Sequence, residues 1–205
     1  MNLSGLLQLV EPSAAESGYR TYFLHFADER PSAMHSPDEF GAILFYILSD
    51  VIGPSEGVAA GIAFRAARSG DTAPFQELMQ VLSREKLPAD LCSTSLRTGT
   101  ALWQQSRRWN WTAGIHEQFD PISTPWVHHA PAFGALVSET TANEIRAIAT
   151  YLFRTAKLLL CAAPSEIKPD DSTAQHILSQ CQESITVLAQ RFSGGNASSI
   201  AAVPS

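Results

Sequence analysis

The chain has 205 residues, of which 45% are hydrophobic and 17% are charged, and its formal net charge at pH 7 is −6. This length is enough for one well-filled core and short for two. The acidic balance argues against a partner that is bound mainly through its phosphates, so we expect no nucleic-acid partner.

The first predicted helix covers residues 3–10. Its apolar residues recur at positions i, i+3, i+4 and i+7, namely Leu3, Leu6, Leu7 and Val10. This spacing predicts one buried stripe. Pro12 is expected to end the helix, because proline lacks the backbone N–H that a continuing helix needs. A second helix is expected over residues 19–29.

A helix start signal stands at Ser36-Pro37-Asp38-Glu39. The serine can cap the helix, the proline suits the first helical position, and the glutamate completes a reciprocal capping box. The helix that follows contains the apolar run 42–48, so we expect it to lie at the centre of the core. Gly53-Pro54 is predicted to end it.

Helical periodicity continues to residue 192, with predicted helices over about 56–69, 73–84, 89–109, 145–161 and 173–192. Gly70 and Gly194-Gly195 are typical of helix ends, and Thr141-Ala142-Asn143-Glu144 repeats the capping-box pattern. Residues 110–125 are expected to form a long irregular connection.

No segment shows sustained alternation of apolar and polar residues. The sequence therefore predicts an all-α fold, a single-domain bundle of roughly eight to ten helices. The domain is expected to cover residues 1–192, followed by a disordered tail over residues 193–205, which is rich in Gly, Ser and Ala.

Compartment is indicated by three features. The apolar run 42–48 is far shorter than the roughly 20 residues that a membrane span needs. Residues 1–5 carry no basic region typical of a secretory signal. The 3 cysteines are odd in number and widely spaced, which argues against a disulfide framework. We expect a cytoplasmic protein without a membrane partner.

The adjacent pair His128-His129 raises the possibility of a metal site. Neighbouring residues on a helix point about 100° apart, so the two rings cannot chelate one ion from one helical face. No CxxC, HExxH or HxH pattern occurs in the sequence. We predict no metal site and no bound cofactor.

Catalytic signatures are also missing from the sequence. It contains no phosphate-binding GxxxxGK[ST] or GxGxxG loop. Carboxylate pairs such as Asp28-Glu29 and Asp170-Asp171 fall at predicted helix ends and turns, where solvation and the helix dipole account for them. The chain is not expected to be an enzyme.

Trp109 and Trp111 flank Asn110 at the end of the predicted helix 89–109, and Trp126 precedes the histidine pair. They could cover the core where the connection crosses it. Alternatively, they could form an exposed aromatic patch for a protein partner, since tryptophan is enriched at binding hot spots.

The order of the segments resembles the urease accessory protein F family (UreF). Residues 6–19 line up without a gap on the family signature LLQLxSPALPxGGF/Y. Pro12, Gly18 and Tyr19 are retained, whereas Ala15 and Ser17 replace a proline and a glycine of the signature.

Four later segments resemble the family in the same order. Residues 66–71 resemble its A-x-x-x-G-D turn, residues 96–100 stand where the family has an Arg-Ala-Ser helix, and residues 129–134 resemble its H-x-x-x-F-G helix start. Residues 175–178 are similar to the Q-R-L-L that opens its late helix. Together the motifs cover about residues 3–190.

The sequence departs from the family at three places. The family continues S-H-S-x-G-L-E after the position of Tyr19, and it has P-L-G-Q where this chain has Lys168-Pro169-Asp170-Asp171. Its C-terminal HE…RLF segment, which helps to dock the urease-binding chaperone, has no counterpart here.

The resemblance implies a scaffold that forms a homodimer and bridges the urease-binding chaperone UreD/UreH and the GTPase UreG during nickel delivery to apo-urease. The residues it assigns to partner binding are Glu11, Pro12, Gly18, Tyr19, His129, Phe133, Gly134 and Gln175. In this interpretation Phe133 packs inward and Gly134 lets another backbone approach closely, while the His129 imidazole meets free N–H groups or a partner.

Three alternatives remain open. The chain could be a helical adaptor of the same fold for another metalloenzyme. It could be an all-α enzyme whose site is assembled only in the fold, which a closed pocket with convergent polar groups would favour. It could also be the ligand-binding domain of a regulator, which would require a DNA-reading segment.

Overall fold

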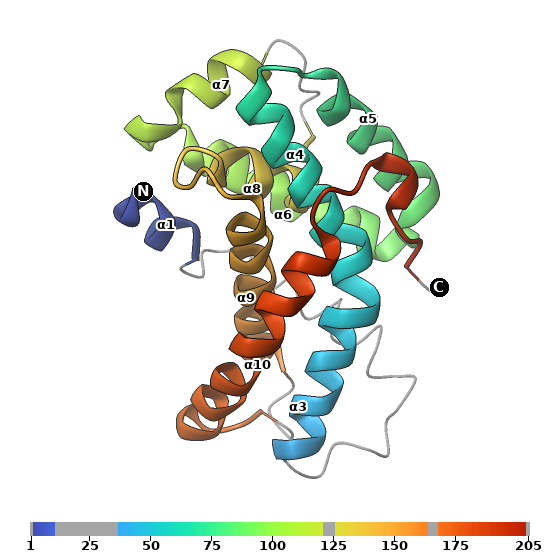
Figure 1. The fold of residues 1–205 in the computed structure, drawn as a ribbon, viewed down its shortest axis with the longest axis vertical. Helices are drawn as coiled ribbons and strands as arrows, with labels where there is room; N and C mark the ends of the chain where they lie inside the picture. Colours follow the sequence, from blue (N-terminus) through green and yellow to red (C-terminus); the bar gives the residue numbers. More distant parts are fainter. Residues whose placement is uncertain (1, 11–36, 121–125, 164–167, 204–205) are drawn as a thin grey trace.

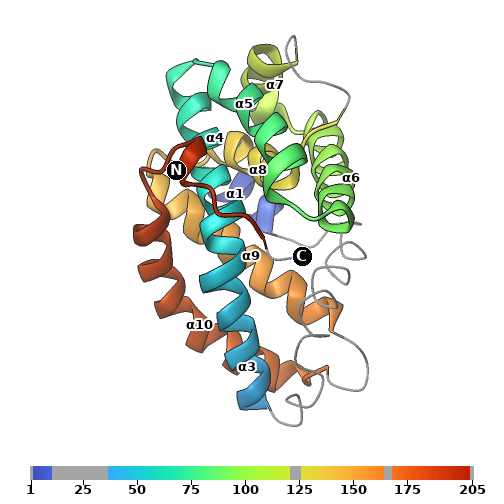
Figure 2. The ribbon, with the colours of Figure 1, turned by 90° about the vertical axis from the view of Figure 1, so that its right-hand side faces the viewer.

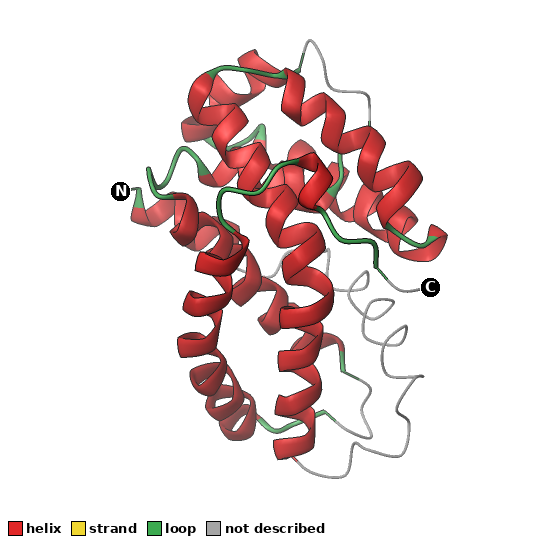
Figure 3. Cartoon of the chain, turned by 45° about the vertical axis from the view of Figure 1, so that its right-hand side comes forward, coloured by secondary structure: helices red, strands yellow, loops and turns green. Residues whose placement is uncertain are grey.

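A computed structural model describes residues 2–10, 37–120, 126–163 and 168–203. Figure 3 shows helices joined by loops, and the described residues contain no strand, which confirms the all-α prediction. The predicted helix over residues 19–29 and the predicted cap at Ser36 lie outside the described residues.

A long helical segment runs through the molecule from α3 (Pro37–Tyr46) through the π-helix η1 (Ile47–Gly57) into α4 (Val58–Ser69). Figures 1 and 2 show it passing from the end where α3, α9 and α10 lie to the end occupied by α4–α8. Within the run 42–48, Leu44, Ile47 and Leu48 are at most 2% exposed, whereas Phe45 is 42% exposed. The predicted central burial of this run is therefore confirmed on one side of the helix.

The predicted helix end at Gly53-Pro54 is wrong. Pro54 lies inside η1, where the helical backbone continues. A proline breaks an α-helix because it lacks an N–H and its ring meets the carbonyl group four residues earlier. The wider π-helical turn, with its i→i+5 pattern, accommodates the ring without ending the helix.

The continuous helix Glu39–Ser69 has 31 residues and a window of mean hydropathy 1.3, so it is long and apolar enough to cross a membrane. The prediction of no membrane-spanning segment considered only the apolar run 42–48 and did not detect the length of the whole apolar helix. Within the structure 67% of that window is buried by the rest of the chain. A core helix of a bundle has the same length and composition, and burial on several sides is its expected property.

The middle of the chain forms shorter helices. Gly70 ends α4 in the left-handed conformation, with φ 77°. α5 (Ala73–Val81) continues into the π-helical turn η2 (Leu82–Lys86), and α6 (Ala89–Ser106) follows. The expected irregular connection over residues 110–125 is wrong in its first part, because η3 (Asn110–Thr112) and α7 (Ala113–Phe119) occupy it.

Helix α8 (His129–Val137) lies in the middle of the bundle, and all of its residues are buried. It packs on α4, α6 and α9. α9 (Glu144–Ala162) and α10 (Asp171–Phe192) pack along each other, as Figure 1 shows. Asn143 caps α9 through its side chain, which accepts from the Arg146 N–H at 3.0 Å. The N-cap is therefore Asn143, and not the Thr141 of the predicted capping box.

The first helix, α1 (Leu3–Val10), does not bury the predicted stripe. Leu9 is 0% exposed, whereas Leu3 and Leu7 are 57% and 56% exposed. The Asn2 N–H donates to the Thr140 carbonyl at 3.1 Å, which attaches the start of α1 to the loop between α8 and α9. The periodicity predicted a helix but not the side it presents to the core.

Residues 193–203 pack on the bundle, in contrast to the predicted disordered tail. The Ala201 N–H donates to the Pro54 carbonyl at 2.9 Å, and the Val203 N–H donates to the Lys86 carbonyl at 2.8 Å. Ile200 is only 2% exposed. The Arg65 guanidinium donates to the Gly195 carbonyl and pairs with Glu144. Small polar residues lack the apolar periodicity that would have revealed this packing.

Candidate functional site at the start of helix α8

The residues assigned to partner binding fall into three groups. Glu11, Pro12, Gly18 and Tyr19 lie outside the described residues. His129, Phe133 and Gly134 are buried in α8. Gln175 is exposed on α10. Gln175 is thus accessible on the surface, whereas the three α8 residues lie inside the bundle.

Helix α8 begins within a buried polar cluster, which includes both adjacent histidines. His128 and His129 are 0% and 2% exposed. The backbone at His128 is extended, with φ −64° and ψ 150°, and the helix starts at the next residue. Because of this change in conformation the two rings reach different helices, and no common ligand position arises between them.

The His128 ring lies between two serine hydroxyls. Nε2 is 2.8 Å from Ser83 Oγ, and Nδ1 is 3.1 Å from Ser95 Oγ. The Ser95 hydroxyl donates to Glu56 Oε1 at 3.4 Å and accepts the His129 backbone N–H at 3.2 Å. Since Ser95 donates to the carboxylate, His128 Nδ1 carries the proton and Nε2 accepts from Ser83.

The His129 ring faces α9. Its Nε2 is 3.3 Å from the Arg154 guanidinium, and its Nδ1 is 3.3 Å from the Tyr151 hydroxyl. An arginine can only donate, so Nε2 accepts and the neutral ring carries its proton on Nδ1. Arg154 is 1% exposed, and its Cζ lies 5.7 Å from the centroid of the Phe133 ring. Cation–π attraction therefore contributes to holding this buried cation.

Burial keeps both histidines neutral. It lowers the pKa of His128 to about 4. The pKa of His129 is also well below its usual value, first because of burial and second because the Arg154 cation disfavours a second positive charge. Neutral rings can act as hydrogen-bond acceptors, and both are used in that way here.

Close backbone contact holds α8 in place. A Cβ atom at Gly134 would lie 2.1 Å from the Ala60 carbonyl oxygen of α4. A Cβ atom at Gly99 of α6 would lie 2.2 Å from the Val127 carbonyl oxygen, just before α8. The predicted close approach at Gly134 is confirmed. Gly99 allows a similar close approach, which was not predicted from the sequence.

The cluster has the character of a structural support. Its histidines, Glu56, Ser95, Tyr151 and Arg154 are all at most 2% exposed, so a substrate has no path to them in this conformation. Across the described ranges, no three His, Cys, Asp or Glu side chains are grouped so that they could hold a metal ion.

Sequence reasoning missed the partners of the histidines. Arg154 lies three residues after Tyr151 on the buried face of α9, so its charge interrupts an otherwise apolar stripe. Glu56 is a comparable charge inside an apolar helix and is 1% exposed. A charged residue at a position of the buried stripe is the signal that could have identified both, since such groups are buried only with partners.

The surface offers two other candidate contacts. Trp109 and Trp111 stack with centroids 5.4 Å apart, and the Trp111 indole N–H donates to Gln8 at 2.7 Å. Trp126 is 59% exposed, whereas Trp103 is buried. The tryptophans therefore divide between core cover and exposed aromatic surface. Gln175 lines a pocket between α9 and α10 with a volume of about 280 Å³.

Comparison with known proteins identifies one family. The family model described as UreF matches residues 34–182, which is more than half of the chain. The matched range includes α8 and the whole buried cluster. A comparison with curated proteins finds no match.

Proposed function

Because this chain belongs to the UreF family of urease accessory proteins, we propose that it is a scaffold for nickel insertion into urease. In this role it binds the urease-binding chaperone UreD/UreH and the GTPase UreG, and it delivers their complex to apo-urease. It acts as a homodimer in the cytoplasm and performs no catalysis itself.

The observation that carries this proposal is the family match over residues 34–182. The geometry of the buried cluster supports it. The two histidines at the start of α8 hydrogen-bond to polar groups of η2, α6 and α9 under the bundle surface, as expected of residues that specify a rigid fold. Such a fold can present separate surfaces to several partners.

In this proposal nickel is cargo, and the partners provide its ligands and the GTP hydrolysis. The sequence has no phosphate-binding loop, and its adjacent histidines hold α8 against α6 and α9. The exposed Gln175 and the segment 11–19 are the positions that we assign to partner contact.

Co-purification is the direct test. Tagged chain should retain both the chaperone and the GTPase from a co-expressing cell, and apo-urease should join through the chaperone. Retention of neither partner would refute the proposed scaffold. Retention of a different metalloenzyme's assembly proteins would favour the alternative adaptor.

A matched pair of variants tests the assignment on α10. Gln175→Ala should weaken retention of a partner, because Gln175 is exposed beside a pocket. Gln180→Ala removes the same side chain from another exposed position of the same helix and should leave retention unchanged. Equal retention by both variants would remove Gln175 from the interface and leave the scaffold proposal intact.

A further inference from the structure

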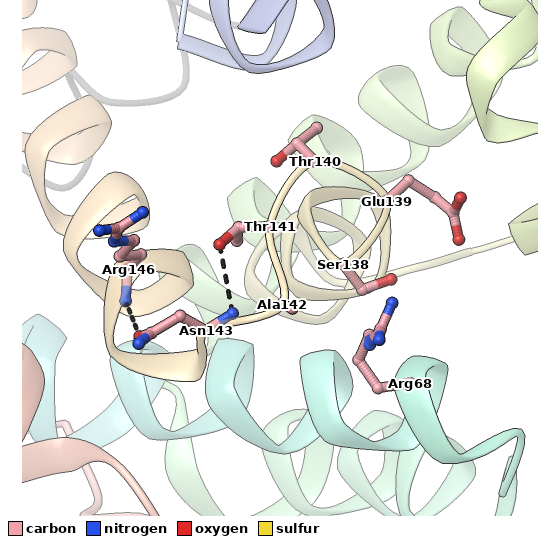
Figure 4. Close-up of a pocket in the computed structure, with 8 residues that line it drawn as sticks. All are labelled: Arg68, Ser138, Glu139, Thr140, Thr141, Ala142, Asn143 and Arg146. Atoms are coloured by element: carbon pink, nitrogen blue, oxygen red, sulfur yellow. Dashed lines mark hydrogen bonds between the residues drawn. The ribbon is translucent and has the colours of Figure 1, made fainter. Parts of the chain in front are cut away.

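A polar pocket of about 550 Å³ lies between the end of α4 and the loop that joins α8 to α9. Figure 4 shows its lining, which includes Arg68, Ser138, Glu139, Thr140, Asn143 and Arg146. Two cations and one carboxylate give the pocket a net positive lining in a chain whose overall formal charge is −6.

Both guanidinium groups are available to a ligand. Neither Arg68 nor Arg146 makes a side-chain hydrogen bond or ion pair with another described residue. Arg65, one helical turn before Arg68, is paired with Glu144. The Glu144 carboxylate also accepts the Gly194 N–H at 2.9 Å. The half-buried Glu144 carboxylate is therefore already engaged by other groups.

The donors of the loop itself are neutral. The Ser138 hydroxyl donates to the Ala135 carbonyl at 2.7 Å, and the Thr140 hydroxyl donates to the Val137 carbonyl at 2.9 Å. The Asn143 side chain accepts the Arg146 backbone N–H. These internal bonds make the loop rigid. The Thr141 hydroxyl and the Asn143 amide oxygen act as acceptors in it, so the loop keeps neutral donors beside the two arginines, which are the charged groups that would hold an anion.

The arginines lie at opposite ends of the pocket, as Figure 4 shows, with Glu139 on the side of Arg68. An extended segment that carries two separated carboxylates can place one at each guanidinium. This geometry favours an acidic peptide over a free phosphate.

Two exposed leucines lie on α1, the helix that is attached to the loop of the pocket. The start of α1 is attached to the Thr140 carbonyl through Asn2. Leu3 and Leu7 are more than half exposed on α1. A segment bound at the arginines could extend over these leucines, so apolar side chains next to its carboxylates would add to binding.

We propose that the Arg68–Arg146 pocket binds an acidic segment of a partner protein, with a carboxylate at each arginine and apolar side chains over α1. This proposal is independent of the proposed function, because it concerns the chemistry of the bound segment and is tested with a synthetic peptide. It also assigns a role to the exposed leucines of α1.

The test measures fluorescence anisotropy of a labelled peptide of aspartate and leucine residues against the full chain. The aspartate peptide should bind, and a peptide with asparagine at every aspartate position should not. Arg68→Gln and Arg146→Gln should each weaken binding by about two- to fivefold, which corresponds to one partly exposed ion pair. Higher salt should weaken it further.

The sharpest control is a variant that should change peptide affinity in the opposite direction. Glu139→Gln removes the carboxylate found among the described residues that line the pocket, and it should strengthen binding by up to about fivefold. Arg97→Gln, at an exposed position of α6 outside the pocket, should have no effect. Circular dichroism of each variant should match the wild-type spectrum, because these side chains are on the surface.

Several outcomes would overturn the proposal. Equal binding of the asparagine peptide, or equal weakening by Arg97→Gln, would show that the pocket is not the binding site. Displacement of the peptide by inorganic phosphate at equal concentration would indicate a small-anion site. Tighter binding of an RNA oligonucleotide, with the same dependence on both arginines, would indicate a nucleic-acid surface.

Discussion

Replacing Gly134 by alanine adds a single methyl group where α8 crosses α4. The new Cβ atom would lie 2.1 Å from the Ala60 carbonyl oxygen, 2.9 Å from its carbonyl carbon and 3.0 Å from its Cα. All three atoms belong to the backbone, so no side-chain rotation relieves the contact. The two helices must therefore move apart.

The distance by which α8 and α4 must separate determines the cost in free energy of unfolding. Ordinary contact begins at 3.4 Å, so the helices must separate by roughly 1.3 Å along this direction. A gap of 0.5–1 Å already removes about a quarter to a half of a dispersion contact, and overpacking typically costs about 1–3 kcal/mol. Because backbone is involved, we expect the upper end of that range. Helix propensity returns about 0.5–1 kcal/mol.

The net expectation is a loss of about 2 kcal/mol in the free energy of unfolding, or about 4–8 °C in Tm for a chain of this size. Urea and thermal denaturation followed by circular dichroism measure both. Gly41→Ala is the matched control, because a Cβ atom there meets nothing within 4 Å inside α3. It should stabilise the chain by about 0.5–1 kcal/mol. Similar stability of the two variants would refute the close contact.

Three further predictions concern the core, the histidines and the C-terminal segment. Leu44→Ala should lower the free energy of unfolding by about 2–5 kcal/mol in urea denaturation, since Leu44 is 2% exposed; a loss below about 1 kcal/mol would contradict its place in the core. The pKa of His128 is lowered from 6.5 to about 4, so the unfolded chain binds the proton first and stability should fall as the pH falls from 6.5 to about 4. His128 alone should account for about 3 kcal/mol of that decrease. His128→Gln should reduce the pH slope and the exposed His176→Gln should not; equal slopes would assign the effect to other groups. Arg65→Met should speed proteolysis within residues 193–203, because it removes the bonds to Gly195 and Glu144. Arg97→Met is its control, and equal cleavage rates would show that Arg65 does not hold the segment.

Local signals predicted the helices that depend on local chemistry. Gly70 and the periodicity before it identified the end of α4, and the apolar spacing over residues 173–192 identified most of α10. The Gly53-Pro54 prediction failed because a π-helical turn accepts a proline that an α-helix rejects. The outward face of α1 depends on how that helix attaches to the α8–α9 loop, which no local pattern encodes.

The candidate site was predictable only in part. Gly134 has no side chain and follows an apolar run, which indicated a close approach to another helix. His129 bonds to Tyr151 and Arg154, which are 22 and 25 residues away in the sequence. Such pairs form only after α8 and α9 pack together, so spacing within one segment cannot reveal them. The same holds for the contact between His128 and Ser83.

The long helix Glu39–Ser69 has a consequence for synthesis on the ribosome. Helices α8, α9 and α10 pack against η1 and α4, and they are encoded after it. At about 5–20 residues per second, residue 192 is made roughly 6–25 s after residue 69. During that interval a 31-residue apolar helix has not yet met the elements that cover it. The nascent chain is therefore a substrate for holding chaperones, whereas a full-length chain refolding in vitro has α8–α10 present from the beginning.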